Sequence, residues 1–175
     1  MKKFNALRDM QYPFTTITHT RKIVRGLIQR EDGLFIMTHI VDHDQFGERN
    51  YYETPGGGIE DGETLFTALH REIQEECGIT IDHLQPIGIV EDYYNLIQRK
   101  NVNHYVYARM TGTCQTTWTE GEKRRIKALP WLTLDAIMNH YASLPQHGIS
   151  QLISQRELPV FQFFKKHQKK YEENV

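Results

Sequence analysis

The chain has 175 residues and a mass of 20.6 kDa, a length typical of a single globular domain. Its 22 acidic residues against 21 lysines and arginines give a formal net charge of −1, which argues against bulk nucleic-acid binding through net positive charge. Two isolated cysteines, no leader-like start and no run of about 20 apolar residues predict a cytoplasmic protein without a disulfide framework or a membrane span.

The first part of the chain is rich in β-forming residues. Two short runs, Lys22–Gln29 and Leu34–Ile40, are predicted to form strands, and the turn sequence between them indicates a hairpin. The polar segment Val41–Asn50 is predicted to be a loop that helps to set specificity. A short strand, Tyr51–Thr54, then leads into the glycine cluster Pro55–Gly58.

Helices and strands alternate in the rest of the chain. Thr64–Cys77 is predicted to be a helix that stops at Gly78, because glycine is common just past a helix C-terminus. Strand-like runs follow at Ile79–Ile81, Pro86–Tyr94 and Val102–Met110. Two further helices are expected at Thr133–Tyr141 and Pro159–Tyr171. This order predicts an α/β fold with a mixed sheet and helices on its faces.

The helix Thr64–Cys77 carries acids where an amphipathic helix normally carries apolar residues. On a wheel of about 100° per residue, its core-facing stripe contains Leu65, Phe66, Leu69 and Ile73. The acids fall as follows: Glu72 and Glu76 lie within this stripe, and Glu75 lies at its edge. Burying unpaired carboxylates costs several kcal/mol each, so a cation is expected beside them. A divalent metal with oxygen ligands, such as Mg²⁺, Mn²⁺ or Ca²⁺, fits these side chains.

The glycines just upstream of this helix are compatible with a phosphate ligand. Gly56, Gly57 and Gly58 lack Cβ atoms, so their backbone can approach a ligand closely. A phosphate would be repelled by bare carboxylates, whereas a divalent metal between them removes the conflict.

These residues together resemble the Nudix box, G-x5-E-x7-R-E-U-x-E-E-x-G-U, in which U is aliphatic. Residues 57–79 match every constrained position, from Gly57 and Glu63 to Arg71, and then through the three helix glutamates to Gly78 and Ile79. The resemblance implies one Nudix hydrolase domain over residues 1–175, folded as an α/β/α sandwich on a mixed β-sheet.

The resemblance also implies a reaction and roles for the matching residues. The expected activity is metal-dependent hydrolysis, with Mg²⁺ or Mn²⁺, of a nucleoside diphosphate linked to another moiety. Glu72, Glu75 and Glu76 would hold the metal, and Glu63 and Arg71 would order the loop and helix through a mutual ion pair. Gly57 and Gly58 would shape the loop on the phosphate side.

The catalytic base and the other substrate contacts are open on sequence alone. The base is either a glutamate of the box or a later acid, Glu120 or Glu122, which could equally be solvated loop residues. Further candidates have structural alternatives. Arg25 could bind a substrate phosphate or could be a charge on a solvated sheet face. Tyr93 and Tyr94 could stack on a base or could pack in the core, and Glu53 could contact substrate or could be a surface acid.

Two other functions remain as alternatives. A Nudix-fold nucleotide-binding or regulatory module without turnover would be expected to lose acids of the box, but all four glutamates and the arginine are present. An isomerase of the same fold would need catalytic residues that this sequence does not reveal. The expected partner is a nucleotide-type small molecule, and a homodimer is compatible with the sequence.

Overall fold

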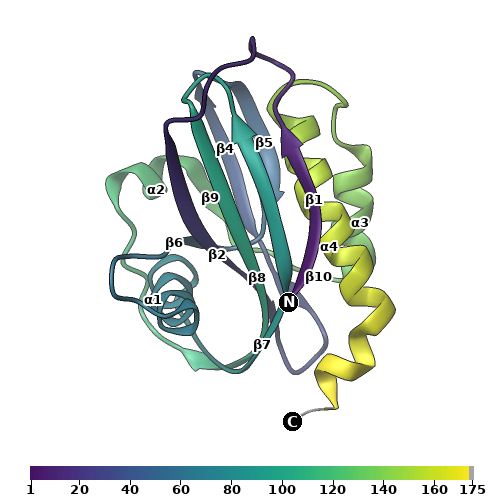
Figure 1. Cartoon of the computed structure of the whole chain (residues 1–175). Coiled ribbons are helices and arrows are strands. Elements are labelled where there is room, and N and C mark those ends of the chain that lie inside the picture. Colours follow the sequence, from purple (N-terminus) through teal and green to yellow (C-terminus); the bar gives the residue numbers. More distant parts are fainter. Residues whose placement is uncertain (174–175) are drawn as a thin grey trace.

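A mixed β-sheet forms the centre of the computed structural model, which describes residues 1–173 (Figure 1). Its strand order is β1-β7-β8-β2-β3-β10, and β6 pairs with β2 on the edge of β2 opposite β8. Two pairs, β1 with β7 and β2 with β8, are parallel, and the remaining pairs are antiparallel. The strands are β1 (Lys2–Arg8), β2 (His19–Gln29), β3 (Phe35–Ile36), β6 (Gly56–Gly58), β7 (Ile79–Tyr94), β8 (Arg99–Thr113) and β10 (Trp131–Leu132).

A second, antiparallel sheet has the order β5-β4-β9 and packs on the same side of the large sheet as the C-terminal helices. It consists of β4 (Thr38–Asp44), β5 (Gly47–Glu53) and β9 (Ile126–Ala128). Phe46, in the turn between β4 and β5, lies edge-on to Tyr94 of β7, with ring centroids 5.5 Å apart. The two sheets therefore share one apolar core.

Helices cover both faces of the large sheet, which confirms the predicted α/β/α sandwich (Figure 1). On one face, α1 packs through Ala68, Leu69 and Ile73 against Val24 and Ile28 of β2. The opposite face carries the small sheet and the helices α3 and α4. The four helices of the described chain are α1 (Leu65–Cys77), α2 (Glu120–Arg125), α3 (Leu134–Ser143) and α4 (Gly148–Glu172). Among residues 1–173, no helix has the length and apolar character needed to span a membrane.

The segment 41–50 differs from the prediction, because it forms most of the β4–β5 hairpin instead of a loop. The hairpin turns at Asp44, whose carboxylate accepts a 2.8 Å hydrogen bond from the backbone N–H of Phe46, and at Gly47, which has a φ of 97°. One side of this small sheet is exposed, so its strands contain many polar residues that resemble a loop in the sequence.

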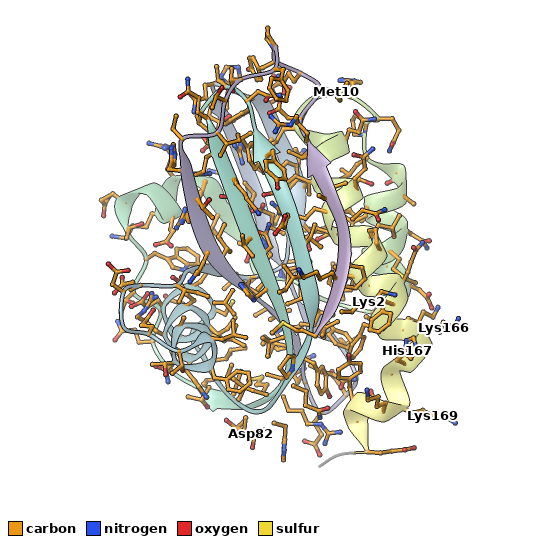
Figure 2. The ribbon with its side chains drawn as sticks, in the orientation of Figure 1. Lys2, Met10, Asp82, Lys166, His167 and Lys169 are labelled. Atoms are coloured by element: carbon orange, nitrogen blue, oxygen red, sulfur yellow. The ribbon has the colours of Figure 1, made fainter. Side chains whose placement is uncertain are left out.

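The last helix also differs from the prediction. It begins at Gly148, eleven residues before the predicted start at Pro159, which lies inside it. Buried Leu152, Ile153 and Val160 hold the segments on both sides of the proline against the core. Near its C-terminus, Lys166, His167 and Lys169 lie on the side of α4 away from α1 (Figure 2).

Three smaller differences concern strands and the helix wheel. Strand β1 was not predicted, although it forms an edge of the large sheet. The run Leu34–Ile40 is divided at Met37 between the two sheets. Phe66, placed in the core-facing stripe by the wheel, is 39% exposed. The predicted helices Thr64–Cys77 and Thr133–Tyr141 are confirmed within two residues. The predicted domain also included residues 174 and 175, which lie outside the described residues.

Candidate active site

Helix α1 is positioned by a cap at each end. The Thr64 hydroxyl accepts a 3.1 Å hydrogen bond from the Thr67 N–H, and Gly78 ends the helix with a φ of 65°. Within this frame, Glu76 is 6% exposed, whereas Glu75 keeps 45% of its side chain exposed. The wheel therefore placed Glu76 on the core side and Glu75 at the edge correctly.

The Glu76 carboxylate is buried between α1, strand β6 (Gly56–Gly58, called the glycine strand below) and the small β5-β4-β9 sheet. One oxygen accepts a 2.8 Å hydrogen bond from the Gly56 N–H, and the other accepts one of 3.2 Å from the Thr38 hydroxyl. Burial raises the pKa of Glu76 to about 7. The Gly56 hydrogen bond opposes this rise, and the negative charge of Glu53 adds to it. No cationic side chain forms an ion pair with Glu76 within residues 1–173.

Glu72 lies directly against the glycine strand. A Cβ on Gly57 would lie only 2.5 Å from Glu72 Oε1, so the carboxylate can occupy its present position only beside a glycine. Burial raises the pKa of Glu72 above its ordinary value, although the neighbouring Arg71 acts in the opposite direction. At Gly56, the φ is 138° and a Cβ would overlap the Val24 carbonyl, so glycine is required there as well.

Arg71 connects the loop before α1 to the carboxylates on the helix. Its guanidinium donates two 2.8 Å hydrogen bonds to Glu63, which confirms the predicted ion pair. It also contacts Glu72 Oε1 at 2.8 Å, Glu75 Oε2 at 3.3 Å and the Gly58 carbonyl at 3.0 Å. The hydrogen bonds from Arg71 lower the pKa of Glu63 to about 2.

The box carboxylates fit a divalent metal in chemical type. Their donors are all oxygens, and the space next to Glu72 exists only because Gly57 has no side chain. In the structure, no three His, Cys, Asp or Glu side chains of residues 1–173 form a group that could hold a metal ion. Arg71 contacts Glu72 and Glu75, and Glu76 is hydrogen-bonded to Thr38 and the Gly56 N–H.

The two later acids have different surroundings. They lie on α2, a short helix instead of the predicted loop. Glu120 is exposed and pairs with Lys123 at 2.6 Å. Glu122 accepts a 2.7 Å hydrogen bond from the Thr119 N–H in a capping box, and its charge contributes to the raised pKa of Glu72. Of the two, only Glu122 has a described electrostatic effect on a box glutamate, and it is the smallest of those that act on Glu72.

Arg25 is buried and Glu53 is partly buried in one charged cluster, so Arg25 is not a charge on a solvated sheet face and Glu53 is not a free surface acid. Arg25 donates to Asn103 Oδ1 at 3.0 Å and to the Thr54 carbonyl at 3.1 Å. Glu53 accepts a 2.7 Å hydrogen bond from Arg156 of α4, which also contacts Asp92 and Glu157. Although burial alone would raise the pKa of Glu53, Arg25 and Arg156 hold it at about 2.

The tyrosines predicted to stack on a base have packing contacts. Tyr94 is buried in the main core. Tyr93 donates a hydrogen bond to Glu91 and lies beside the cations of Arg8 and Lys100. None of these described contacts involves β6 or α1.

Several residues next to the box were missed. Thr38 contacts Glu76 from the small sheet, and Arg156 and Glu157 lie on the part of α4 that was not predicted. Arg156 and Glu157 are adjacent opposite charges, but the segment before them mixes apolar residues with serines and glutamines, so it gave only a weak signal for a buried ion pair. For Thr38 no local signal existed, because its contact joins residues that are 38 positions apart.

Comparison with known proteins decides the family. A family model described as "NUDIX domain" matches residues 19–152. This chain belongs to the Nudix family. Members of the Nudix hydrolase family are in general pyrophosphohydrolases that act on phosphoanhydride bonds.

Individual Nudix proteins are distant in sequence. "Nudix hydrolase 5" of Arabidopsis thaliana is 24% identical over 103 residues, which cover 59% of this chain and 32% of that protein. A "MutT-like protein" of Streptomyces ambofaciens is 28% identical over 121 residues and 69% of each chain. A Nudix hydrolase structure from Nitrosomonas europaea superposes with a TM-score of 0.61 at 16% identity, covering 86% of this chain and 90% of that one. This similarity shows the fold.

Proposed function

We propose that this chain is a metal-dependent hydrolase that cleaves the diphosphate linkage of a nucleoside diphosphate linked to another moiety. The observation that carries the proposal is the Glu76 carboxylate, which is buried beside the glycine strand without a cationic partner among residues 1–173. Such a group destabilises the fold, and a charge that violates local rules in this way is typical of functional sites.

Glu72, Glu75 and Glu76 would hold Mg²⁺ or Mn²⁺. A divalent cation bound there would supply positive charge that makes water more acidic and neutralises charge on the phosphates. The water oxygen forms a bond to one phosphorus, the bridging P–O bond breaks, and the other phosphate leaves. The proton passes to a carboxylate, either a glutamate of the box or Glu122.

Other residues of the chain position these groups. Arg71 and Glu63 hold the glycine strand against α1, since Arg71 also contacts the Gly58 carbonyl. Gly57 and Gly58 keep the phosphate side of the site open. Arg25 and Glu53 retain a proposed place near the substrate, on the strands that flank the glycines. For Tyr93 and Tyr94, base stacking stays a prediction that no described contact supports.

The test is a panel of nucleoside diphosphate derivatives, incubated with Mg²⁺ or Mn²⁺ and analysed by chromatography of the products. We expect two phosphate-bearing products from at least one substrate and no turnover in EDTA. Robust hydrolysis in EDTA would contradict the metal-dependent mechanism. Tight nucleotide binding without turnover would instead favour the alternative of a binding or regulatory module.

A further inference from the structure

Two arginines beside the box share one face of the large sheet. Strands β2 and β8 are parallel, and their register pairs His19 with Arg99 and Arg21 with Asn101. Side chains alternate along a strand, so Arg21 lies on the same face as Arg25, and Arg99 on the same face as Asn101 and Asn103. The hydrogen bond from Arg25 to Asn103 shows that these are the same face of the sheet.

Neither arginine has an anionic partner. Within residues 1–173, neither guanidinium forms a hydrogen bond or an ion pair, and Arg99 Nε is buried without a hydrogen-bond partner. The guanidinium carbon of Arg99 lies 5.9 Å from the centroid of the Tyr94 ring. Every other arginine of the chain contacts a carboxylate, a carbonyl or a hydroxyl.

A buried amide completes the set. Asn101 is 2% exposed, and its Oδ1 has no hydrogen-bond partner. Buried polar atoms are nearly always paired, and an unpaired one costs about 1–3 kcal/mol. Three neighbouring side chains of β2 and β8 thus have unused hydrogen-bonding capacity.

The set lies next to the proposed phosphate site. The guanidinium of Arg21 lies against the glycine strand, because a Cβ on Gly58 would be 2.9 Å from its Nη2. The pKa of Arg21 is lowered, mainly by loss of hydration and then by the positive charge of Arg99, while Glu72 acts in the opposite direction. An anion that contacts both guanidiniums would remove this repulsion.

We propose that Arg21, Arg99 and Asn101 form a second phosphate subsite, which selects nucleoside polyphosphates with a phosphate beyond the cleaved diphosphate. Two guanidiniums match a doubly charged phosphate through bidentate hydrogen bonds, whereas a neutral sugar could not compensate their charge. The NH2 group of Asn101 can donate to a phosphate oxygen, whereas its unpaired Oδ1 is an acceptor that can bond only a guanidinium N–H of the subsite. This assignment depends on the proposed function, because it places the subsite next to the phosphates held by the box.

The kinetic test compares two substrate classes. The probes are ATP and GTP as triphosphates, and ADP-ribose and UDP-glucose as nucleotides with a sugar in the corresponding place. Removing one charged hydrogen-bonding group with Arg21→Gln or Arg99→Gln should lower kcat/KM for the triphosphates about 10- to 100-fold. The value for the sugar nucleotides should change less than about threefold.

The matched controls are Arg30→Gln, just beyond the far end of β2, and Arg109→Gln, near the far end of β8. Both should retain wild-type kcat/KM for all four probes. An equal loss on both substrate classes, or no loss in either test variant, would overturn the subsite.

A binding experiment separates failure of the subsite from failure of the hydrolase proposal. Isothermal titration calorimetry with Mg²⁺ would compare inorganic tripolyphosphate with pyrophosphate. Tripolyphosphate should bind the wild type at least about tenfold more tightly, and Arg21→Gln and Arg99→Gln should remove this advantage. That result without any turnover would retain the subsite and contradict the hydrolase. Turnover with equal affinities for both anions would retain the hydrolase and overturn the subsite.

Discussion

The hydroxyl of Thr38 donates a 3.2 Å hydrogen bond to the carboxylate of Glu76, which joins the first residue of β4 to the last turn of α1. Thr38 is fully buried, so this bond lies in the protein interior. Together with the Gly56 N–H, it satisfies both oxygens of Glu76 without supplying positive charge. The carboxylate is thereby held by two neutral donors and has no ion-pair partner among residues 1–173.

The first prediction concerns the stability of metal-free protein as a function of pH. Because burial raises the pKa of Glu76 from 4.5 to about 7, the folded state binds a proton that the unfolded state releases between these values. The Glu76 contribution to stability is therefore lost as pH rises from 4.5 to 7, by up to about 3 kcal/mol. In EDTA, Glu76→Gln should be more stable than wild type at pH 8 and nearly equal at pH 4.5, as measured by urea denaturation.

A surface acid provides the control for this measurement. Glu31→Gln changes an exposed carboxylate and should show the wild-type dependence on pH. If Glu76→Gln follows the same curve as Glu31→Gln, the charge of Glu76 does not destabilise the fold.

The second prediction is that bound metal reverses the order of stability of the wild type and Glu76→Gln. A ligand that binds only the folded state adds about 1.4 kcal/mol when its free concentration is ten times its Kd. At pH 8, Mg²⁺ or Mn²⁺ should stabilise the wild type but give Glu76→Gln little benefit, and the variant should also lose turnover. Melting temperatures with and without metal provide the measurement. Equal stabilisation of both proteins would place the metal elsewhere.

The third prediction distinguishes the two acids of α2. Glu122→Gln preserves the capping box, because glutamine can also accept at that position, but it removes a proton acceptor near Glu72. If Glu122 is the base, kcat should fall about 100-fold or more. Glu120→Gln, two residues away on an exposed side chain, should retain wild-type kcat. Equal rates in both variants would assign the base to a glutamate of the box.

The fourth prediction concerns the space beside Glu72. In Gly57→Ala the added Cβ would overlap the Glu72 carboxylate, which can move because it is the end of a flexible side chain. Stability should change by no more than about 1 kcal/mol, whereas displacement of a catalytic group by about 1 Å should lower kcat about 100-fold. Gly121→Ala, whose Cβ would meet only Thr119 Oγ1 at 3.9 Å, is the control. Full activity of Gly57→Ala would show that Glu72 need not occupy this position.

The fifth prediction tests the buried charged cluster. Arg156→Met leaves Glu53, Asp92 and Glu157 without their shared cation, and breaking such a cluster typically costs about 3–5 kcal/mol. A second change, Glu157→Gln, should recover part of this loss because it removes one of the uncompensated charges. Arg30→Met, which breaks an exposed pair with Asp32, should cost at most about 1 kcal/mol. Urea denaturation measures all three, and equal losses for Arg156→Met and Arg30→Met would contradict the role of the cluster.

The local parts of the site could be predicted from the sequence. The orientation of Glu72, Glu75 and Glu76 follows from helical periodicity, and the Glu63–Arg71 pair lies within eight residues of chain. The motif also indicated the family, since its spacing fixes which groups meet. These features depend only on short-range geometry.

The remaining parts depend on contacts between distant segments. The small sheet places polar residues on an exposed face. For this reason segment 41–50 lacks the clear alternation of apolar and polar residues that would have indicated strands. The sequence could not decide whether Arg25 binds phosphate or is a solvated strand charge, because its partners Glu53 and Glu157 come from β5 and α4. Pairing between parallel strands such as β2 and β8 likewise has no signature in a single sequence.

The charged cluster around Arg156 has a consequence for the smallest fragment that can fold and function. The family match ends at residue 152, yet Arg156 and Glu157 lie beyond it. Arg156 holds Glu53, three residues before the glycine strand, and Glu157 pairs with Arg25 and Arg156. A fragment cut at residue 152 would retain every residue of the Nudix box. It would also retain Arg25, Glu53 and Asp92, whose charges would then lack the cation and the anion that α4 supplies. The recognisable motif is thus smaller than the unit that a truncation or a domain graft must preserve.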